Sequence, residues 1–367
     1  MLKTAVRLTR LTEAAADLKQ TIYKGYRSLV PPQYRTAARW VWGIFALSSV
    51  LWFQGIPDGA PLTVHFYDVG QGDAIHVRTA QGFDVLIDGG PSARVVEKLG
   101  RTLPFWDRTI ELLILTHPHA DHLVGQIEVL RRFTVKQVLA TGVLHTTDEY
   151  LEWLKEIKNR EIPMAVAKAS QEFPISLPTE DLPKGDNSQF PNESQIPIPK
   201  LEILWPQEDL SGKRIAEKSE ADGGLNATSI AAKLTYGKTS FLFTGDAEEG
   251  VEDALLSPQS SVHGSRKCQN KTVNCELITD DSRLRSDVLK VGHHGSKTST
   301  SKEFLQAVAP KYAVIQSGRK NRFGHPHFQT LWRLKQQGVE ILRNDQDGDV
   351  VFESDGTALQ YRVQRKK

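Results

Sequence analysis

Cysteine is almost absent from this sequence, with two residues in 367. A metal site built chiefly on thiolates needs more cysteines than that, so none is expected. Cys268 and Cys275 are near enough in sequence to close a short disulfide inside a loop, provided that the body of the protein lies outside the cytoplasm. Two free thiols are the alternative, with equal weight. Fixed-period repeats are also lacking, so no solenoid is expected.

A surplus of positive charge is missing from most of the chain. Residues 1–39 carry eight Lys and Arg against two acidic residues, whereas the remaining 328 residues carry 38 basic and 42 acidic groups. The net charge is therefore +6 in the tail and −4 in the body. Tight non-specific binding of nucleic acid draws on clustered Lys and Arg, so the body can contact phosphates only through a local cluster. A content of 39% hydrophobic and 25% charged residues fits one large or two smaller globular domains.

Charge of either sign is missing from residues 40–57. As a helix these 18 residues would span about 27 Å, close to the ~30 Å hydrocarbon thickness of a bilayer. Trp40, Trp42 and Trp52 lie near the two ends, where indole rings favour the membrane interface. The pattern predicts a single-pass membrane protein with residues 1–39 in the cytoplasm and the body outside it. A buried core helix and a cleaved signal peptide are the alternatives.

The body, residues 60–367, alternates strand-like apolar runs with helical patterns. This alternation argues for an α/β fold of packed sheets covered by helices. Two polar stretches without an apolar period are interpreted as flexible inserts, about 170–200 and about 256–285. Helices are expected over Ser92–Leu99, Leu123–Phe133 and Asp148–Asn159, and near Gln329–Gln337.

Four side chains that bind protons and metals are crowded into LTHPHADH, residues 115–122. An apolar run precedes this stretch and a helical pattern follows it, which places it at the end of a sheet, where α/β sheets hold ligands. His117 and His119 would point to the same side of an extended loop, and Asp121 and His122 follow as a second pair. Two such pairs can bind two metal ions a few Å apart. A set of solvated polar loop residues is the alternative.

Three further apolar runs end in ionisable residues. VLIDGG ends in Asp88, FLFTGD ends in Asp246, and VLKVGHHGS ends in His293 and His294. Each motif alone is common turn chemistry. Their joint occurrence with the histidine-rich loop favours a shared site.

The order of these motifs resembles that of the metallo-β-lactamase superfamily. The stretches VHFYDVGQGDAI, LNATSIAAKLTYGKTSFLFTGDAE, LKVGHHGSKTSTS and GRKNRFGHPH are similar to the extracytoplasmic metallo-hydrolase domain of the ComEC-type competence proteins, which take up DNA. The likeness covers about residues 60–360 and implies an αββα sandwich with a two-metal site at the sheet edges. ComEC-type proteins also carry a large polytopic membrane region. This chain is expected to have one span, so it is not expected to transport DNA alone.

The resemblance and the side-chain chemistry together imply a set of ligands for two divalent ions, Zn²⁺ or Mn²⁺. A water between the two ions would lose a proton at neutral pH and give a hydroxide nucleophile. The expected ligands are His117 and His119 for the first ion, Asp121, His122 and His294 for the second, and Asp246 as the bridge.

Three residues are the candidates for catalysis: Asp88, Asp121 and His293. Asp88 is expected to orient His117 or His119 from behind, and His293 to supply a proton or hold the leaving oxygen.

Many members of the superfamily have a further histidine ligand between the second motif and the late aspartate. Here His145 is the only histidine in that interval, and Asn226 lies near the expected place with a neutral amide, which is a poor ligand. The first ion is therefore expected to have an open or water-filled position. His145 and Asn226 remain candidates for binding substrate.

The segment GRKNRFGHPH places Arg319, Lys320 and Arg322 beside His325 and His327. It is interpreted as a phosphate clamp next to the metals, with His325 pointing inward, and a solvated charged face is the alternative at even weight. Near the start of the body, Gly70 and Gly72 would allow a tight hairpin. Asp73 beside them is taken as structural, and lining the site is the alternative.

These inferences predict a membrane-anchored, binuclear metal-dependent hydrolase of phosphodiesters, and specifically a nuclease related to DNA uptake. Its implied partners are nucleic acid, the membrane and a membrane channel. A hydrolase of small or cell-surface phosphodiesters is the first alternative. The second is a weakly active scaffold subunit of a DNA-uptake machine, which the near-complete ligand set argues against.

Overall fold

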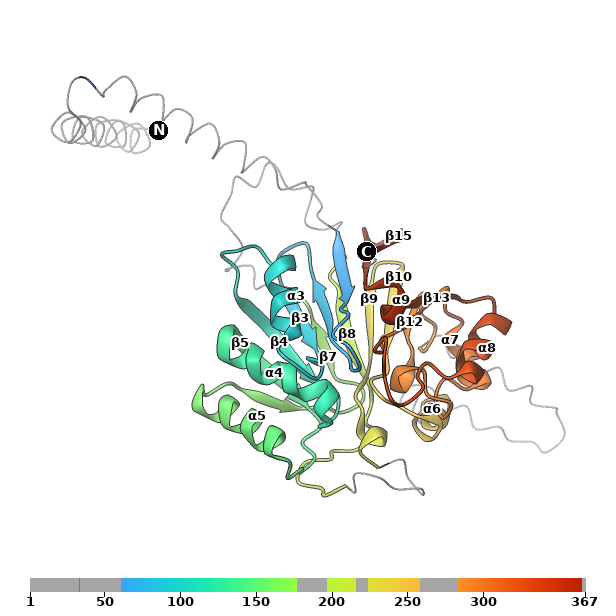
Figure 1. Ribbon diagram of the computed structural model, residues 1–367, viewed down its shortest axis with the longest axis horizontal. Helices are drawn as coiled ribbons and strands as arrows, with labels where there is room; N and C mark the ends of the chain where they lie inside the picture. The colour runs from blue at the N-terminus through green and yellow to red at the C-terminus, as the bar shows by residue number, and fades with distance from the viewer. Residues whose placement is uncertain (1–32, 34–60, 177–196, 216–223, 258–282, 365–367) are drawn as a thin grey trace, which may run out of the picture. The chain divides into compact units, whose positions relative to one another are not determined.

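Two β-sheets pack face to face in the computed structural model of this chain (Figure 1). The first sheet has eight strands, in the spatial order β15 (Leu359–Gln364), β14 (Asp349–Ser354), β1 (Leu62–Phe66), β2 (Ile75–Arg78), β3 (Asp84–Ile87), β4 (Thr109–Leu115), β5 (Thr134–Ala140) and β6 (Met164–Val166). The second has seven, in the order β13 (Glu340–Arg343), β12 (Tyr312–Ile315), β11 (Val288–Lys290), β10 (Thr239–Phe243), β9 (Ala231–Tyr236), β8 (Lys200–Trp205) and β7 (Glu172–Pro174).

Helices cover the outer face of each sheet, so the layers are helix, sheet, sheet, helix (Figure 1). The first sheet is covered by α3 (Arg94–Thr102), α4 (Ala120–Arg132) and α5 (Asp148–Asn159). The second is covered by α6 (Glu249–Leu256), α7 (Lys302–Val308) and α8 (Phe328–Gln336). Shorter helical segments are η3 (Gly224–Thr228), η5 (Gly292–Gly295) and α9 (Asn344–Asp347). The expected αββα sandwich is confirmed.

Three apolar layers hold these elements together. The layer between the sheets includes Phe66, whose ring lies 6.2 Å from that of Phe243 and 6.0 Å from that of Phe352. Strand β4 shows how a buried strand serves two layers, because alternate side chains point to opposite faces. Leu112 faces the other sheet and Leu113 faces the helices. This explains the unbroken apolar run of β4, which a parallel strand buried on both faces requires.

The structure describes residue 33 and residues 61–176, 197–215, 224–257 and 283–364. The chain separates into two units, residues 1–58 and residues 59–367. The predicted membrane span over residues 40–57 and both cysteines lie outside the described residues, as does the basic segment 1–39 apart from residue 33. Within the described ranges, no helix is long and apolar enough to cross a bilayer.

Several boundaries differ from those expected from the sequence. The helix expected over Ser92–Leu99 starts and ends later as α3, and the one expected over Leu123–Phe133 starts earlier as α4. The first polar insert was predicted over about residues 170–200, which is too long, because β7 lies inside this range and pairs with β8. Helices α6 and α7 were not expected at all. Both are short, eight and seven residues, so their apolar period is hard to recognise in sequence.

Parallel pairing brings the polar motifs to one edge of the sandwich. Strand β3 runs parallel to β4, and β10, β11 and β12 run parallel to one another. Within each sheet the carboxyl ends of these strands lie at one edge, where open α/β sheets hold ligands. The two edges adjoin, because Nε2 of His122, which follows β4, lies 3.4 Å from Oδ1 of Asp246, which follows β10. The residues that follow these strands build the candidate site.

Candidate metal centre

The loop after β4 presents two histidines to the interior. His117 lies in this loop and His122 in the first turn of α4, and both side chains are fully buried. Helix α4 is fixed against the sheet by Gln126, whose Nε2 donates to the carbonyl of Ile114 over 2.7 Å. The strand-to-helix turn thus holds both rings in place before any ligand binds.

Glycine at Gly72 allows the β1–β2 loop to lie against the histidine-rich loop. Its φ is +140°, and a Cβ atom there would come within 2.1 Å of the carbonyl oxygen of Asp121. The neighbouring amide of Asp73 points to the same carbonyl at 3.3 Å. The sequence predicted only a tight hairpin from this glycine, whereas the structure also uses it to bring two loops together.

Two consecutive histidines after β11 adopt the left-handed conformation. His293 has φ 43° and His294 has φ 53°. Non-glycine residues avoid this region, at a cost of roughly 1–2 kcal/mol each. The turn lets two adjacent side chains face the same centre, which an extended strand does not allow.

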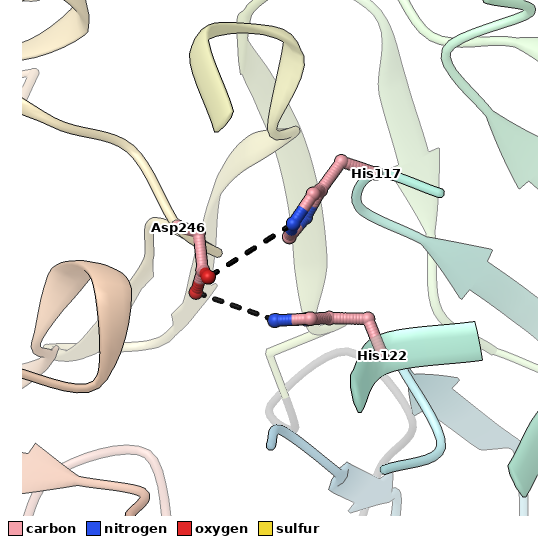
Figure 2. A group of neighbouring side chains, drawn as sticks. All are labelled: His117, His122 and Asp246. Carbon is pink, nitrogen blue, oxygen red and sulfur yellow. Dashed lines mark ion pairs between the residues drawn. The ribbon is translucent and has the colours of Figure 1, made fainter. Parts of the chain in front are cut away.

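The carboxylate of Asp246, after β10, is the point on which the imidazoles converge (Figure 2). Nε2 of His122 lies 3.4 Å from Oδ1, Nε2 of His294 lies 3.5 Å from Oδ2, and Nε2 of His117 and of His293 each lie 3.9 Å from Oδ2. Asp246 is 2% exposed. Its Oδ1 and the Nε2 of His122 are buried without a hydrogen-bond partner in the described part of the chain. Buried polar atoms normally have one, so the pair is suited to a shared cation.

The spacing of the donor atoms also fits metal ions. Two ligand atoms at about 2.0–2.1 Å from one tetrahedral zinc ion lie about 3.3 Å apart. Nε2 of His294 and Oδ2 of Asp121 are separated by 3.2 Å. Nε2 of His117 and Nδ1 of His119 are separated by 2.9 Å. All six residues expected as ligands therefore lie at one centre, and their nitrogen and oxygen atoms suit divalent ions.

Negative charge dominates the interior of this centre. Burial lowers the pKa of His122, but Asp246 and Asp88 outweigh it and hold that pKa well above its usual value. Burial also opposes protonation of His294, but Asp246 and Asp73 raise its pKa to about 10. The carboxylates thus draw protons onto these two imidazoles when no other cation is near. The pKa of His117 is instead held well below its usual value by burial and by the neighbouring His122. Divalent ions would supply the same charge and displace those protons.

Asp88 binds His122 directly, whereas the sequence suggested His117 or His119. It reaches His117 only through the hydroxyl of Thr116, which lies 3.1 Å from Nδ1 of His117. Its Oδ2 accepts from Nδ1 of His122 over 2.8 Å and from the hydroxyl of Thr116 over 2.7 Å. The register explains the difference, because β3 and β4 pair in parallel and place Asp88 beside the backbone of Thr116. A carboxylate that binds one ring nitrogen directs the other toward a metal. Asp88 is thus a positioning residue for His122.

A buried lysine, Lys290 at the end of β11, was missed by the sequence analysis. Its ammonium group donates to the carbonyl of Gly245 over 2.7 Å, forms an ion pair with Asp73 and lies 3.8 Å from Oδ1 of Asp246. Asp73 also lies 3.3 Å from Nδ1 of His294. Asp73 therefore lines the centre from behind, which was the less favoured interpretation. The sequence feature that could have pointed to Lys290 is a lysine inside an apolar strand, just before two histidines.

Glu248 is a second residue that the sequence analysis missed. Its Oε1 lies 2.6 Å from Nδ1 of His293 and accepts from Nδ2 of Asn226 over 3.1 Å. Burial raises the pKa of Glu248, but these two neighbours lower it below its usual value, so the carboxylate is ionised. Asn226 thus lies beside His293 at the edge of the centre, with its Nδ2 also 3.4 Å from Nδ1 of that ring. The position of Glu248, two residues after Asp246, was the available signal.

The predicted basic cluster lies on the loop between β12 and α8. Arg319, Lys320 and Arg322 are exposed there. From the same loop, the ring of His325 reaches inward to 5.4 Å from the ring of His293. Burial and the neighbouring histidines lower the pKa of His325 to about 4, so this ring is neutral at physiological pH. The loop therefore joins an exposed basic surface to the metal centre.

His145 is not brought to the centre. Its side chain is partly exposed, and its Nδ1 lies 3.1 Å from the hydroxyl of Thr147. No contact among the described residues links it to the six predicted ligands. The prediction that His145 binds substrate therefore has no structural support. Its place in the chain, between two motifs, was not a guide to its place in the fold.

Comparison with known proteins agrees with the motifs. Residues 67–319 match the sequence model of the metallo-beta-lactamase superfamily. ComE operon protein 3 of Bacillus subtilis (strain 168) is 28% identical over 308 residues, covering 79% of this chain and 32% of that protein. Competence protein ComA of Neisseria gonorrhoeae is 31% identical over 320 residues, covering 85% of this chain and 35% of that protein. The resemblance to ComEC-type proteins is confirmed.

The chain spans about a third of the length of these two curated relatives. Among solved structures, the metallo-beta-lactamase fold protein YhfI from Bacillus subtilis superposes with a TM-score of 0.43 and 10% sequence identity. The superposition covers 80% of this chain and 100% of that one.

Proposed function

This chain belongs to the metallo-β-lactamase superfamily, and we propose that it is a metal-dependent hydrolase of phosphodiesters whose substrate is nucleic acid. The observation that carries the proposal is the position of one loop. The loop after β12 presents Arg319, Lys320 and Arg322 to solvent and sends His325 to the edge of the metal centre. A strand of phosphodiesters would place one phosphate at the centre and its neighbours on the basic side chains.

In this proposal the six expected ligands are divided between two metal ions. His117 and His119 would hold one divalent ion, Asp121, His122 and His294 the other, and Asp246 both. When bound, such ions polarise a phosphoryl oxygen and lower the pKa of water near it.

Other polar residues orient the imidazole rings and supply a proton to the leaving oxygen. Asp88 keeps His122 oriented through its Nδ1. His293, held by Glu248, directs Nε2 into the centre, where it can protonate a leaving oxygen. The neutral ring of His325 lies next to it as a donor or acceptor for the substrate.

Turnover of two substrates tests this function. The purified full-length chain, loaded with Zn²⁺ or Mn²⁺, would be assayed on a single-stranded oligonucleotide and on bis(p-nitrophenyl) phosphate. We expect cleavage of both, with the oligonucleotide favoured in kcat/KM. Cleavage of the small diester alone would support the small-diester hydrolase instead. If metal-loaded protein cleaves neither substrate, the result would support the alternative of a weakly active scaffold subunit.

We further propose a membrane-anchored role in DNA uptake. The names of the two curated relatives support the link to competence, and the uncharged residues 40–57 after a basic tail support the anchor. The proposal includes a membrane channel as a partner in this uptake. A reporter fused after Lys367 is expected to be active only outside the cytoplasm. Cytoplasmic activity of the reporter would contradict the proposed topology.

A further inference from the structure

Three large aromatic side chains are exposed just outside the metal centre. Phe323 lies on the loop after β12, and Phe328 and Trp332 lie one helical turn apart on α8. Their exposed fractions are 56%, 70% and 61%. We call these three residues the aromatic row. Exposing three such rings on neighbouring segments leaves apolar surface uncovered, and grouped exposure of this kind marks a binding site.

One member of the aromatic row, Phe323, is linked to the metal centre by neighbouring rings. The ring of Phe323 stacks on that of His325, with centroids 6.0 Å apart and planes inclined by 28°. The ring of His325 in turn lies 5.4 Å from His293 and 6.3 Å from the metal ligand His294. A flat group resting on Phe323 would thus lie two rings away from the place where a phosphate is cut.

Positive charge accompanies the rings. The guanidinium of Arg322 lies 5.2 Å from the centre of the Phe323 ring. Arg319 and Lys320 are exposed earlier on the same loop, and Lys335 is exposed on α8, one turn beyond Trp332. Exposed rings and cations on the same two segments suit a ligand with both flat apolar faces and negative charges. A polynucleotide has both, whereas an apolar protein surface would leave the cations unpaired.

From these observations we propose that the aromatic row binds unpaired bases and so selects single-stranded nucleic acid as the substrate. The proposal rests on the proposed function, because it concerns the same metal centre. Every base has a π-face, so stacking tolerates any sequence. Bases inside a duplex are stacked on one another and cannot reach the row. The cations hold the phosphates between the stacked bases.

Binding to two matched strands tests the proposal. A labelled oligothymidine of about 12 nucleotides, and a strand of equal length with abasic sites throughout, would be titrated with the full-length chain in the presence of a chelator, so that neither is cut. The variants are Phe323→Ala, Phe328→Ala and Trp332→Ala. The matched controls are Phe105→Ala and Trp106→Ala, which remove rings that are 79% and 64% exposed. These two lie before β4, at the opposite end of that strand from the centre. All five positions are exposed, so the variants are expected to fold.

We expect each variant of the aromatic row to lose about tenfold in affinity for oligothymidine and to bind the abasic strand as the wild type does. The controls should change neither. Equal affinity of wild type and row variants for oligothymidine would overturn the proposal and assign the rings to a protein partner. Equal losses on both strands would also overturn it, because base stacking would then contribute nothing. Wild-type hydrolysis of bis(p-nitrophenyl) phosphate, measured separately, tests the proposed function independently of either result.

Discussion

The carboxylate of Glu248 holds the imidazole of His293, with Oε1 2.6 Å from Nδ1. The other ring nitrogen, Nε2, is left 3.9 Å from Oδ2 of Asp246. An ionised carboxylate accepts the Nδ1 proton and fixes the orientation of the ring. Glu248 therefore fixes the direction in which His293 faces the metal centre.

Removing this carboxylate should impair the reaction without removing metal. Glu248→Ala is expected to lower kcat by about 10- to 100-fold, because the ring of His293 loses its partner. Metal content should stay as in the wild type, since the six predicted ligands are untouched. Glu249→Ala changes the exposed neighbour and is the control. Metal loss that parallels the loss of activity in Glu248→Ala would show that Glu248 maintains the ligands and not His293.

The two metal sites should differ in affinity. The first has two imidazoles and a shared Asp246, whereas the second adds a carboxylate, Asp121, to its imidazoles and the same shared residue. Calorimetric titration of the metal-free chain is expected to show one tighter and one weaker site, and mild chelation should empty the weaker one first. His119→Ala should affect the weaker site alone. A single class of two equal sites would speak against this assignment.

The stability of the fold should fall in acid partly because of His65. Burial, and then the nearby His76 and Arg362, lower the pKa of His65 to about 3. The unfolded chain takes up this proton near pH 6.5, whereas the folded chain resists it until about pH 3, so stability is lost as pH falls through that window. His65→Phe should reduce the loss, by up to about 1.4 kcal/mol per pH unit. Urea unfolding at pH 7 and pH 5 measures this change in the free energy of unfolding.

His145→Gln removes a partly exposed histidine and provides the matched control for His65→Phe. Its loss of stability between the two pH values should equal that of the wild type. A wild-type slope in His65→Phe would mean that this imidazole does not contribute to acid sensitivity.

The salt dependence of DNA binding should report the basic loop. Each lost phosphate contact removes a released counterion, so changing Arg319, Lys320 and Arg322 together to Ala should reduce the slope of log affinity against log salt by about three units. Hydrolysis of a small diester should fall far less, because it has no flanking phosphates. Equal loss of DNA binding and small-diester turnover would place these side chains in the reaction centre. Unchanged DNA binding would favour the small-diester hydrolase.

Much of the metal centre could be predicted from sequence because its ligands follow apolar strands in short motifs. His117 lies in the loop after β4, His122 lies in the first turn of α4 that follows, and Asp246 lies in the loop after β10. Parallel strands bring such loops to one edge whatever the details of the packing. The αββα arrangement followed from the resemblance of these same motifs.

The supporting residues could not be predicted, because long-range packing decides what they contact. Asp73 and Lys290 form an ion pair only when the β1–β2 loop lies against the end of β11 in the other sheet. Asp88 could have served any of three histidines, and the register of β3 with β4 selects His122. The aromatic row was not predicted either, because the residue type alone does not distinguish an exposed aromatic side chain on α8 from a buried one.

Metal content, measured by mass spectrometry on the purified full-length chain and its Asp246→Ala variant, tests the central claim most directly. Asp246 faces four imidazole nitrogens at 3.4–3.9 Å, so its loss should weaken both sites. We predict close to two ions per wild-type chain, loss of at least one in the variant, and loss of most diester hydrolysis with it. Asp253→Ala, an exposed change on α6, should retain both ions. Full metal content and unchanged turnover in Asp246→Ala would contradict the two-metal centre.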